Sequence, residues 1–277
     1  MKPSITLTKM MFWGGLVFLY LPMLVLIVYS FNAGRNVQIW AGWSTHWYGE
    51  LFRDQQLVNA LGRSLQVAFF AATASTVLGT LAAIAMVRLR RFKGRTLFSG
   101  LVTAPLVMPD VIIGLSMLLL FVSLQQWLGW PQRGLSTVWI AHTTFGLAYA
   151  TVVVSSRLRE LDESIEEAAL DLGATPVQAF FQVTLPIIWP ALLSAWLLAF
   201  TLSLDDVVIA SFVTGPGATT LPIEIFSAVR LGVSPKINAL ATLIIIAISL
   251  VAFSSWYVTR RIDQRNRLAQ RVLDIKS

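Results

Sequence analysis

Three aspartates lie within long apolar runs of the sequence, namely Asp110, Asp205 and Asp206. A carboxylate at the depth of a bilayer costs about 2.5–3.5 kcal/mol on insertion scales, so such groups usually face a cavity or a partner. Neither run contains a lysine or arginine that could neutralise them. The three side chains therefore predict a negatively charged path in the outer half of a membrane, which favours a cationic solute over an anionic one.

Asp205 and Asp206 also admit a structural interpretation. Adjacent carboxylates near the end of a span can cap a helix, because they accept hydrogen bonds from its first amide groups. They can also lie at the membrane interface without touching a solute. The sequence leaves both interpretations open beside the path for a cation.

Other kinds of chemistry find little support. A phosphate-binding loop requires a Gly-Lys pair, and none occurs. The two histidines, His46 and His142, lie in different segments and cysteine is absent, so we expect no metal site and no cysteine nucleophile. The net charge of +7 is carried by residues at helix ends without a basic and aromatic surface, so we expect no nucleic acid partner.

Composition indicates an all-α integral membrane protein. Of the 277 residues, 56% are hydrophobic and 13% are charged, and the mean hydropathy is +0.71. A helix needs about 20 apolar residues to cross a bilayer. About six segments meet this requirement within a single domain covering 1–277, and they are 11–31, 65–87, 97–124, 135–155, 187–212 and 238–258.

Two of these spans carry features that predict their packing. In the third, Pro105 and Pro109 lack an amide hydrogen, so we expect a kink with free carbonyl oxygens that line a cavity. In the second, small side chains recur at helical spacing and allow another backbone to approach closely. These small residues are Ala68, Ala72, Ser75, Gly79 and Ala83.

Basic residues predict the orientation of the chain. Most of the 21 Lys and Arg residues fall on the side that holds both chain ends and the segment 160–186. By the positive-inside rule, both termini and this segment are expected in the cytoplasm. The segment 32–62 then lies outside, where its tryptophans suit an aromatic belt at the membrane interface, with a binding lid as the alternative.

The segment 160–186 lies between two apolar runs and reads as a rigid corner. Gly173 can take the left-handed conformation that ends a helix, and Thr175 followed by Pro176 is a cap and first-turn signal for a second helix. Two short helices that meet at a glycine give a partner a firm surface to push. An amphipathic connector on the membrane surface is the alternative, but its acidic residues would face anionic headgroups.

The spacing within this segment resembles the cytoplasmic EAA loop of permease subunits from type I ABC importers. The resemblance is carried by Glu167, Ala168, Ala169, Gly173, Val183, Leu185 and Pro186, with valine in the usual isoleucine position. In that family the two helices of the loop are coupling helices that sit in a cleft of the nucleotide-binding subunit. The resemblance implies the permease fold of that family and assigns coupling to the ATPase to Glu167, Ala168, Ala169, Gly173, Leu185 and Pro186.

Three further stretches resemble the polyamine branch of these permeases, in particular those of bacterial putrescine importers. They are residues 108–114, 201–217 and 233–242. The resemblance implies a non-catalytic subunit of the bacterial inner membrane that pairs with a second, similar permease. It also implies two cytoplasmic ATPases, which would bind ATP and Mg²⁺, and a periplasmic binding protein that delivers the diamine. No cofactor is expected on this chain.

Two other classes of protein compete with this hypothesis. A secondary transporter driven by a proton or sodium gradient would use Asp110, Asp205 or Asp206 as the ion carrier. This hypothesis leaves the residue spacing in 160–186 unexplained. A membrane-embedded enzyme would need a nucleophile beside a base, or a metal cluster, within a span, and the sequence indicates neither. On the importer hypothesis, Asp205→Asn or Asp206→Asn is expected to lower transport without preventing assembly.

Overall fold

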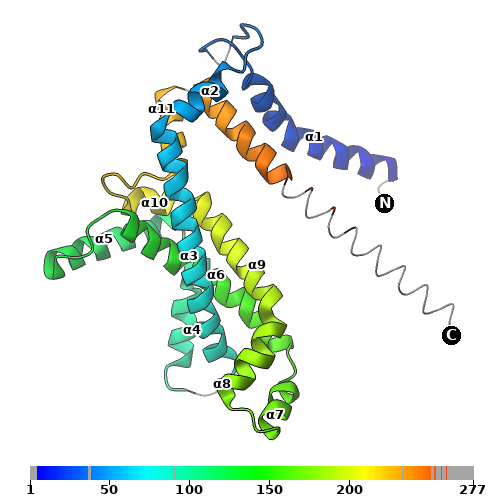
Figure 1. Ribbon diagram of the computed structural model, residues 1–277, viewed down its shortest axis with the longest axis vertical. Helices are drawn as coiled ribbons and strands as arrows, with labels where there is room; N and C mark the ends of the chain where they lie inside the picture. The colour runs from blue at the N-terminus through cyan, green and yellow to red at the C-terminus, as the bar shows by residue number, and fades with distance from the viewer. Residues whose placement is uncertain are drawn as a thin grey trace. The chain divides into compact units, whose positions relative to one another are not determined.

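The computed structural model describes residues 5–36, 39–89, 92–232 and 234–250, together with Phe253, Tyr257 and Arg260. Within these residues every regular element is a helix (Figure 1), apart from one isolated antiparallel bridge between Asn32 and Trp43. The chain divides into two compact units. Unit 1 comprises 1–55 and 228–277, and unit 2 comprises 56–227.

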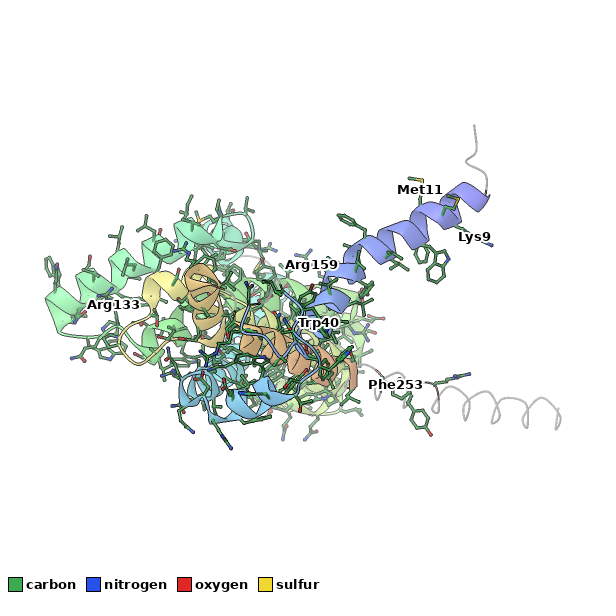
Figure 2. The ribbon with its side chains drawn as sticks, turned by 90° about the horizontal axis from the view of Figure 1, so that it is seen from above. Lys9, Met11, Trp40, Arg133, Arg159 and Phe253 are labelled. Atoms are coloured by element: carbon green, nitrogen blue, oxygen red, sulfur yellow. The ribbon has the colours of Figure 1, made fainter. Side chains whose placement is uncertain are left out.

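Unit 1 contains α1 (Ile5–Tyr29), α2 (His46–Arg53) and a helix over Pro235–Leu250. The apolar side chains of α1 are largely exposed along the helix, and Figure 2 shows Lys9 and Met11 projecting from it. A continuous exposed apolar surface of this kind is unfavourable in water. α1 therefore has the character of a helix that faces lipid or a partner subunit.

Buried polar contacts hold the loop between α1 and α2. The side chain of the fully buried Asn32 donates to the Ile39 carbonyl and accepts from the Ala41 amide, both at 2.8 Å. Trp47 of α2 donates its indole N–H to the Asn32 carbonyl at 2.8 Å. Trp43, by contrast, is exposed, as an interfacial aromatic residue would be.

Unit 2 contains the other named helices. In chain order they are α3 (Gln55–Val87), α4 (Arg95–Thr103), the 3₁₀ turn η1 (Ala104–Leu106), α5 (Asp110–Leu128), α6 (Leu135–Glu160), α7 (Glu163–Asp171), α8 (Pro176–Ala179), the π-helical η2 (Phe180–Thr184), α9 (Leu185–Leu204), α10 (Val208–Val213) and α11 (Leu221–Leu231). The first residue of α3 and the end of α11 belong to unit 1. α6 is the central helix and packs against α4, α5, α9 and α10.

Five helices in the described ranges are long and apolar enough to cross a membrane. They are Thr8–Tyr29, Gln55–Val87, Asp110–Leu128, Leu135–Glu160 and Pro176–Leu204. The sixth predicted span, 238–258, corresponds to the shorter helix Pro235–Leu250. Most of its remaining residues lie outside those that the structure describes.

The third span differs from the prediction. A single helix over 97–124 was expected to kink, but the backbone breaks completely between α4 and α5. Pro109 is extended, with φ −59° and ψ 138°, and a new helix begins at Asp110. Two prolines four residues apart remove two amide donors. Ala104 before Pro105 stays helical in η1, so the break falls at Pro109, where a proline also disfavours helical geometry in the preceding residue.

The fifth span also differs from the predicted range 187–212. α9 ends at Leu204, and a separate short helix, α10, begins at Val208. The apolar sequence continues through this break, so hydropathy gives no sign of it. The two aspartates at 205 and 206 therefore lie in a joint between helices and not inside one.

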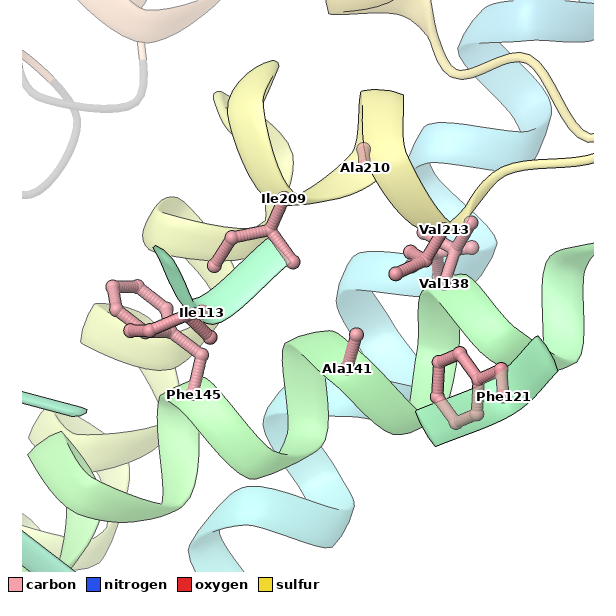
Figure 3. Packing of buried hydrophobic residues seen from close by; sticks show 9 residues of the cluster. Ile113, Phe121, Val138, Ala141, Phe145, Ile209, Ala210 and Val213 are labelled. Atoms are coloured by element: carbon pink, nitrogen blue, oxygen red, sulfur yellow. The ribbon is translucent and has the colours of Figure 1, made fainter. Parts of the chain in front are cut away.

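A cluster of buried apolar side chains joins α3, α5, α6 and α10 (Figure 3). In this view Phe121 of α5 lies toward Val138 and Val213, whereas Ile113 lies toward Ile209. α5 and α10 thus run in the same direction across α6. Their N-termini, which carry the acidic residues, lie at the same end of the cluster.

The small-residue face of α3 packs as predicted. Ala68, Ala72, Ser75, Gly79 and Ala83 are all buried. A Cβ atom built on Gly79 would lie 2.7 Å from the Cβ of Ala150 in α6. The prediction that this face allows close helix packing is confirmed.

Gly79→Ala is expected to destabilise the folded chain by about 1–3 kcal/mol, because the added methyl would also meet the backbone of Thr151 at 3.0 Å. Gly62→Ala is the matched control in the same helix, since nothing lies within 4 Å of its added Cβ. That control should be neutral or stabilise by up to about 1 kcal/mol. Thermal unfolding in detergent measures both, and equal stability of the two variants would contradict the packing described.

Candidate functional site

The predicted glycine corner is present at the end of α7. Gly173 has φ +90°, its amide donates to the Leu170 carbonyl at 2.9 Å, and the Ala174 amide donates to the Ala169 carbonyl at 3.1 Å. This is the Schellman arrangement that closes a helix with a left-handed residue. The prediction that Gly173 forms the corner is confirmed.

Side chains cap both helices of this segment. Asp162 accepts a hydrogen bond from the Ser164 amide at 3.0 Å, and this contact, with a second from the Ser164 hydroxyl, lowers the pKa of the Asp162 carboxyl. The stabilisation of α7 is therefore complete above the ordinary pKa of 3.8 and is lost as the pH falls through the lowered value. Thr175 accepts from the Gln178 amide at 3.3 Å, with Pro176 in the first turn, as predicted.

The second helix of the segment does not end before the fifth span. α8 continues through η2 into α9, so that Pro176–Leu204 forms one helix of 29 residues. Leu185 and Pro186 lie within this helix. Pro186 cannot donate a backbone hydrogen bond, and just before it the Leu185 amide reaches the Phe180 carbonyl, five residues earlier. The helix thus passes the proline with a widened π turn.

The outer side of the corner is a surface that we call the docking face, formed by Glu167, Ala168, Leu172, Val177 and Phe181. All five side chains are exposed, and Leu172 is 90% exposed. Within the described residues the Glu167 carboxylate has no hydrogen-bond or ion-pair partner. The docking face therefore combines apolar side chains with a carboxylate free to bind a basic group. Ala169 is half-buried behind it.

The inner side of α7 is tied to α3. The Arg88 guanidinium donates to Oε1 of Glu166 at 2.8 Å, and its other terminal nitrogen lies 3.3 Å from Oε1 of Glu163. Thr184, the last residue of η2, donates its hydroxyl to the same oxygen of Glu166 at 2.6 Å. Sequence reasoning missed this contact, because Arg88 and Glu166 are 78 residues apart and are both ordinary residues for a helix end.

Asp206 is engaged in structural contacts. Its Oδ1 accepts from the Ile209 amide at 3.2 Å, and its Oδ2 accepts from the Ala210 amide at 2.7 Å. The same Oδ2 lies 3.1 Å from Nε2 of His142 in α6, and Nδ1 of that ring lies 2.7 Å from the Ser203 hydroxyl. Among the interpretations that the sequence left open, helix capping is therefore confirmed for Asp206.

A serine, a histidine and a carboxylate in a row can activate the serine as a nucleophile. A substrate must be able to reach that nucleophile. Ser203 is buried, and both oxygens of Asp206 bind backbone amides. The arrangement therefore fits a structural link between α6, α9 and α10 better than a catalytic one.

Asp205 and Asp110 have different surroundings from Asp206. Both side chains are exposed, and no described side chain donates a hydrogen bond to either carboxylate. Asp110 is the first residue of α5, and one turn later Gly114 lies against Phe212 of α10. Asp110 begins α5, whereas Asp205 and Asp206 lie in the joint between α9 and α10. Within the described residues no group of side chains could hold a metal ion.

Known proteins are similar to this chain in sequence and in fold. Residues 75–268 match the family described as "Binding-protein-dependent transport system inner membrane component". The chain is 60% identical to the putrescine transport system permease protein PotI of Escherichia coli K12, over 95% of this chain and 92% of that protein. It is 42% identical to the spermidine/putrescine transport system permease protein PotC of Haemophilus influenzae, over 88% and 93% respectively.

A solved structure of a bacterial ABC transporter that imports alginate has a chain with a TM-score of 0.69 to this one. At 17% identity, over 90% of this chain and 93% of that chain, the likeness shows the fold alone. It agrees with the overall helical fold described above. This chain belongs to the family of inner membrane components of binding-protein-dependent transport systems.

Proposed function

We propose that this chain is the permease subunit of an ATP-driven importer that carries putrescine or a related polyamine across the inner membrane. The observation that carries the proposal is the docking face beside the Gly173 corner, which is rigid, exposed and tied to the spans. The names of the similar proteins supply the substrate class. The chain itself is non-catalytic, and a partner ATPase supplies the energy by hydrolysing ATP with Mg²⁺.

The importer that we propose contains a second, similar permease, two ATPase subunits and a periplasmic polyamine-binding protein. The ATPase binds the docking face with Glu167 and the neighbouring apolar residues, and Gly173 keeps the angle between α7 and α8 fixed. Both termini and the segment 160–186 lie in the cytoplasm, as the distribution of basic residues predicts. The outer segment 215–225, which includes the start of α11, then faces the binding protein.

The substrate path in this proposal uses the exposed carboxylates of Asp205 and Asp110. A diamine carries positive charge at both ends, and exposed carboxylates with no described side-chain donor are suited to attract it. Asp206 stands next to Asp205 in the same joint. It contributes to the field of the path, while its own oxygens hold α10 and His142 in place.

The test reconstitutes the chain in liposomes, alone and with its partner subunits and binding protein, and follows labelled putrescine. We expect uptake only in the full complex, and only with ATP. Uptake by the chain alone under a proton or sodium gradient would identify a secondary transporter instead. The complex could instead hydrolyse ATP only when its binding protein carries a different solute. That result would support the importer part of the proposal and contradict putrescine as its substrate.

A further inference from the structure

Arg88 directly follows α3, and its side chain is bound within the fold. Its side chain is only 18% exposed although it lies at the end of a helix. An arginine there can satisfy the positive-inside rule while remaining in contact with water and headgroups. The guanidinium of Arg88 instead turns toward α7 and places its two terminal nitrogens on two carboxylates.

The spacing of these carboxylates explains the geometry. Glu163 and Glu166 are three residues apart, so they lie on the same face of α7. Glu167 follows at about 100° around the helix and belongs to the docking face. One short helix thus has an outer side for a partner and an inner side bound to Arg88.

Glu166 also connects α7 to the fifth span. Its Oε1 atom receives hydrogen bonds from Arg88 at 2.8 Å and from Thr184 at 2.6 Å. Thr184 is buried and directly precedes α9. A single carboxylate oxygen therefore joins the end of α3, the middle of α7 and the start of α9.

Apolar packing is incomplete at this point. A half-open pocket of about 250 Å³ lies among α3, α6, α7, α8 and η2, and Arg88, Glu166 and Thr184 line it. Space under α7 that side chains do not fill contributes no van der Waals contact. The polar contacts of Glu166 connect α7 to α3 and η2 beside this pocket.

We infer that Arg88, Glu166 and Thr184 form a clasp that passes movement of α7 to α3 and α9. We assign the three as positioning residues for coupling, because their contacts join helices of this chain to one another. This inference rests on the proposed function, in which a partner ATPase moves α7. It assigns the transfer of that movement to charge-assisted hydrogen bonds, which are stronger and more directional than neutral ones.

The experiment compares variants of the chain in the reconstituted importer, with binding protein and ATP present. Labelled putrescine uptake and phosphate release are measured together, and their ratio gives the solute moved per ATP hydrolysed. Arg88→Gln and Glu166→Gln are expected to lower this ratio about tenfold while ATP hydrolysis continues. The exchange Arg88→Glu with Glu166→Arg should recover part of the ratio, since it restores an opposite pair.

Arg157→Gln is the matched control, because Arg157 forms an exposed ion pair with Glu160 at 3.1 Å on α6. It should leave the ratio unchanged. An unchanged ratio in Arg88→Gln and Glu166→Gln would overturn the clasp. A wild-type complex that takes up putrescine without ATP would instead overturn the proposed function, so the two failures are distinguishable.

The absence of cysteine from the chain allows a second measurement if the single variants assemble poorly. Arg88→Cys with Glu166→Cys removes both charges and introduces two thiols that a short bifunctional reagent can bridge. With cysteine-free partner subunits, we expect the bridged protein to regain coupling that the unbridged protein lacks. Equal coupling before and after bridging would count against a mechanical link at this point.

Discussion

Gly173→Val is expected to lower ATP-driven putrescine uptake about tenfold or more while ATP hydrolysis continues. The backbone of Gly173 has φ +90°, a conformation that a β-branched residue resists strongly. A Cβ at this position would meet nothing within 4 Å, so the effect comes from the backbone alone. The valine would force α7 and α8 to a different angle and disturb the docking face without filling any space.

Gly173→Asn is the control for this prediction. Asparagine adopts the left-handed conformation far more readily than valine, so the corner should keep its shape. We expect Gly173→Asn to retain most of the uptake per ATP. If valine and asparagine behave alike, the left-handed conformation of residue 173 is not what coupling requires.

The two adjacent aspartates are expected to respond differently to the same substitution. Asp205→Asn should raise the putrescine concentration for half-maximal uptake about tenfold, equivalent to about 1.4 kcal/mol, and leave assembly intact. Its carboxylate is exposed and no described side chain donates to it, so removing its charge breaks no side-chain contact in the described residues. Uptake measured against putrescine concentration in the reconstituted importer tests this.

Asp206→Asn should act on the fold before it acts on transport. The carboxylate uses one oxygen for the Ile209 amide and the other for both the Ala210 amide and His142. An asparagine has only one acceptor oxygen, so one buried donor loses its partner, at a cost of about 1–3 kcal/mol. The midpoint temperature of thermal unfolding of the purified complex should fall for Asp206→Asn and remain unchanged for Asp205→Asn.

This expectation is more specific than the one drawn from the sequence, in which either substitution lowers transport without preventing assembly. A stable Asp206→Asn complex with impaired uptake would support the expectation from the sequence. Loss of stability in Asp205→Asn would show that its carboxylate has a role in the fold. Either result changes which carboxylate is assigned to the solute.

Local sequence signals predicted the parts of the site that depend on neighbours along the chain. Gly173, Thr175 and Pro176 act through residues within one turn, so their roles could be read from residue type and spacing. The small face of α3 was predictable for the same reason, because helical periodicity alone brings Ser75 and Gly79 to one side. The structure confirmed each of these predictions.

The contacts that the sequence did not reveal join residues far apart along the chain. Hydropathy identifies an apolar span but not which helix it faces, so neither Arg88 with Glu166 nor His142 with Asp206 could be paired in advance. The break after α9 was hidden for a related reason. A carboxylate that caps a buried helix start compensates for the lost backbone bonds, and the surrounding residues stay apolar.

The helix from Pro176 to Leu204, which includes the π turn η2, connects the Gly173 corner to the joint that holds Asp205. Its 29 residues span about 43 Å at 1.5 Å per residue, and Asp205 follows its last turn. A swing of about 10° around the inner end carries that aspartate sideways by about 7 Å, roughly the length of a diamine. On the proposed substrate path, a small rotation of this helix about its inner end is therefore enough to move the Asp205 carboxylate from one position to another.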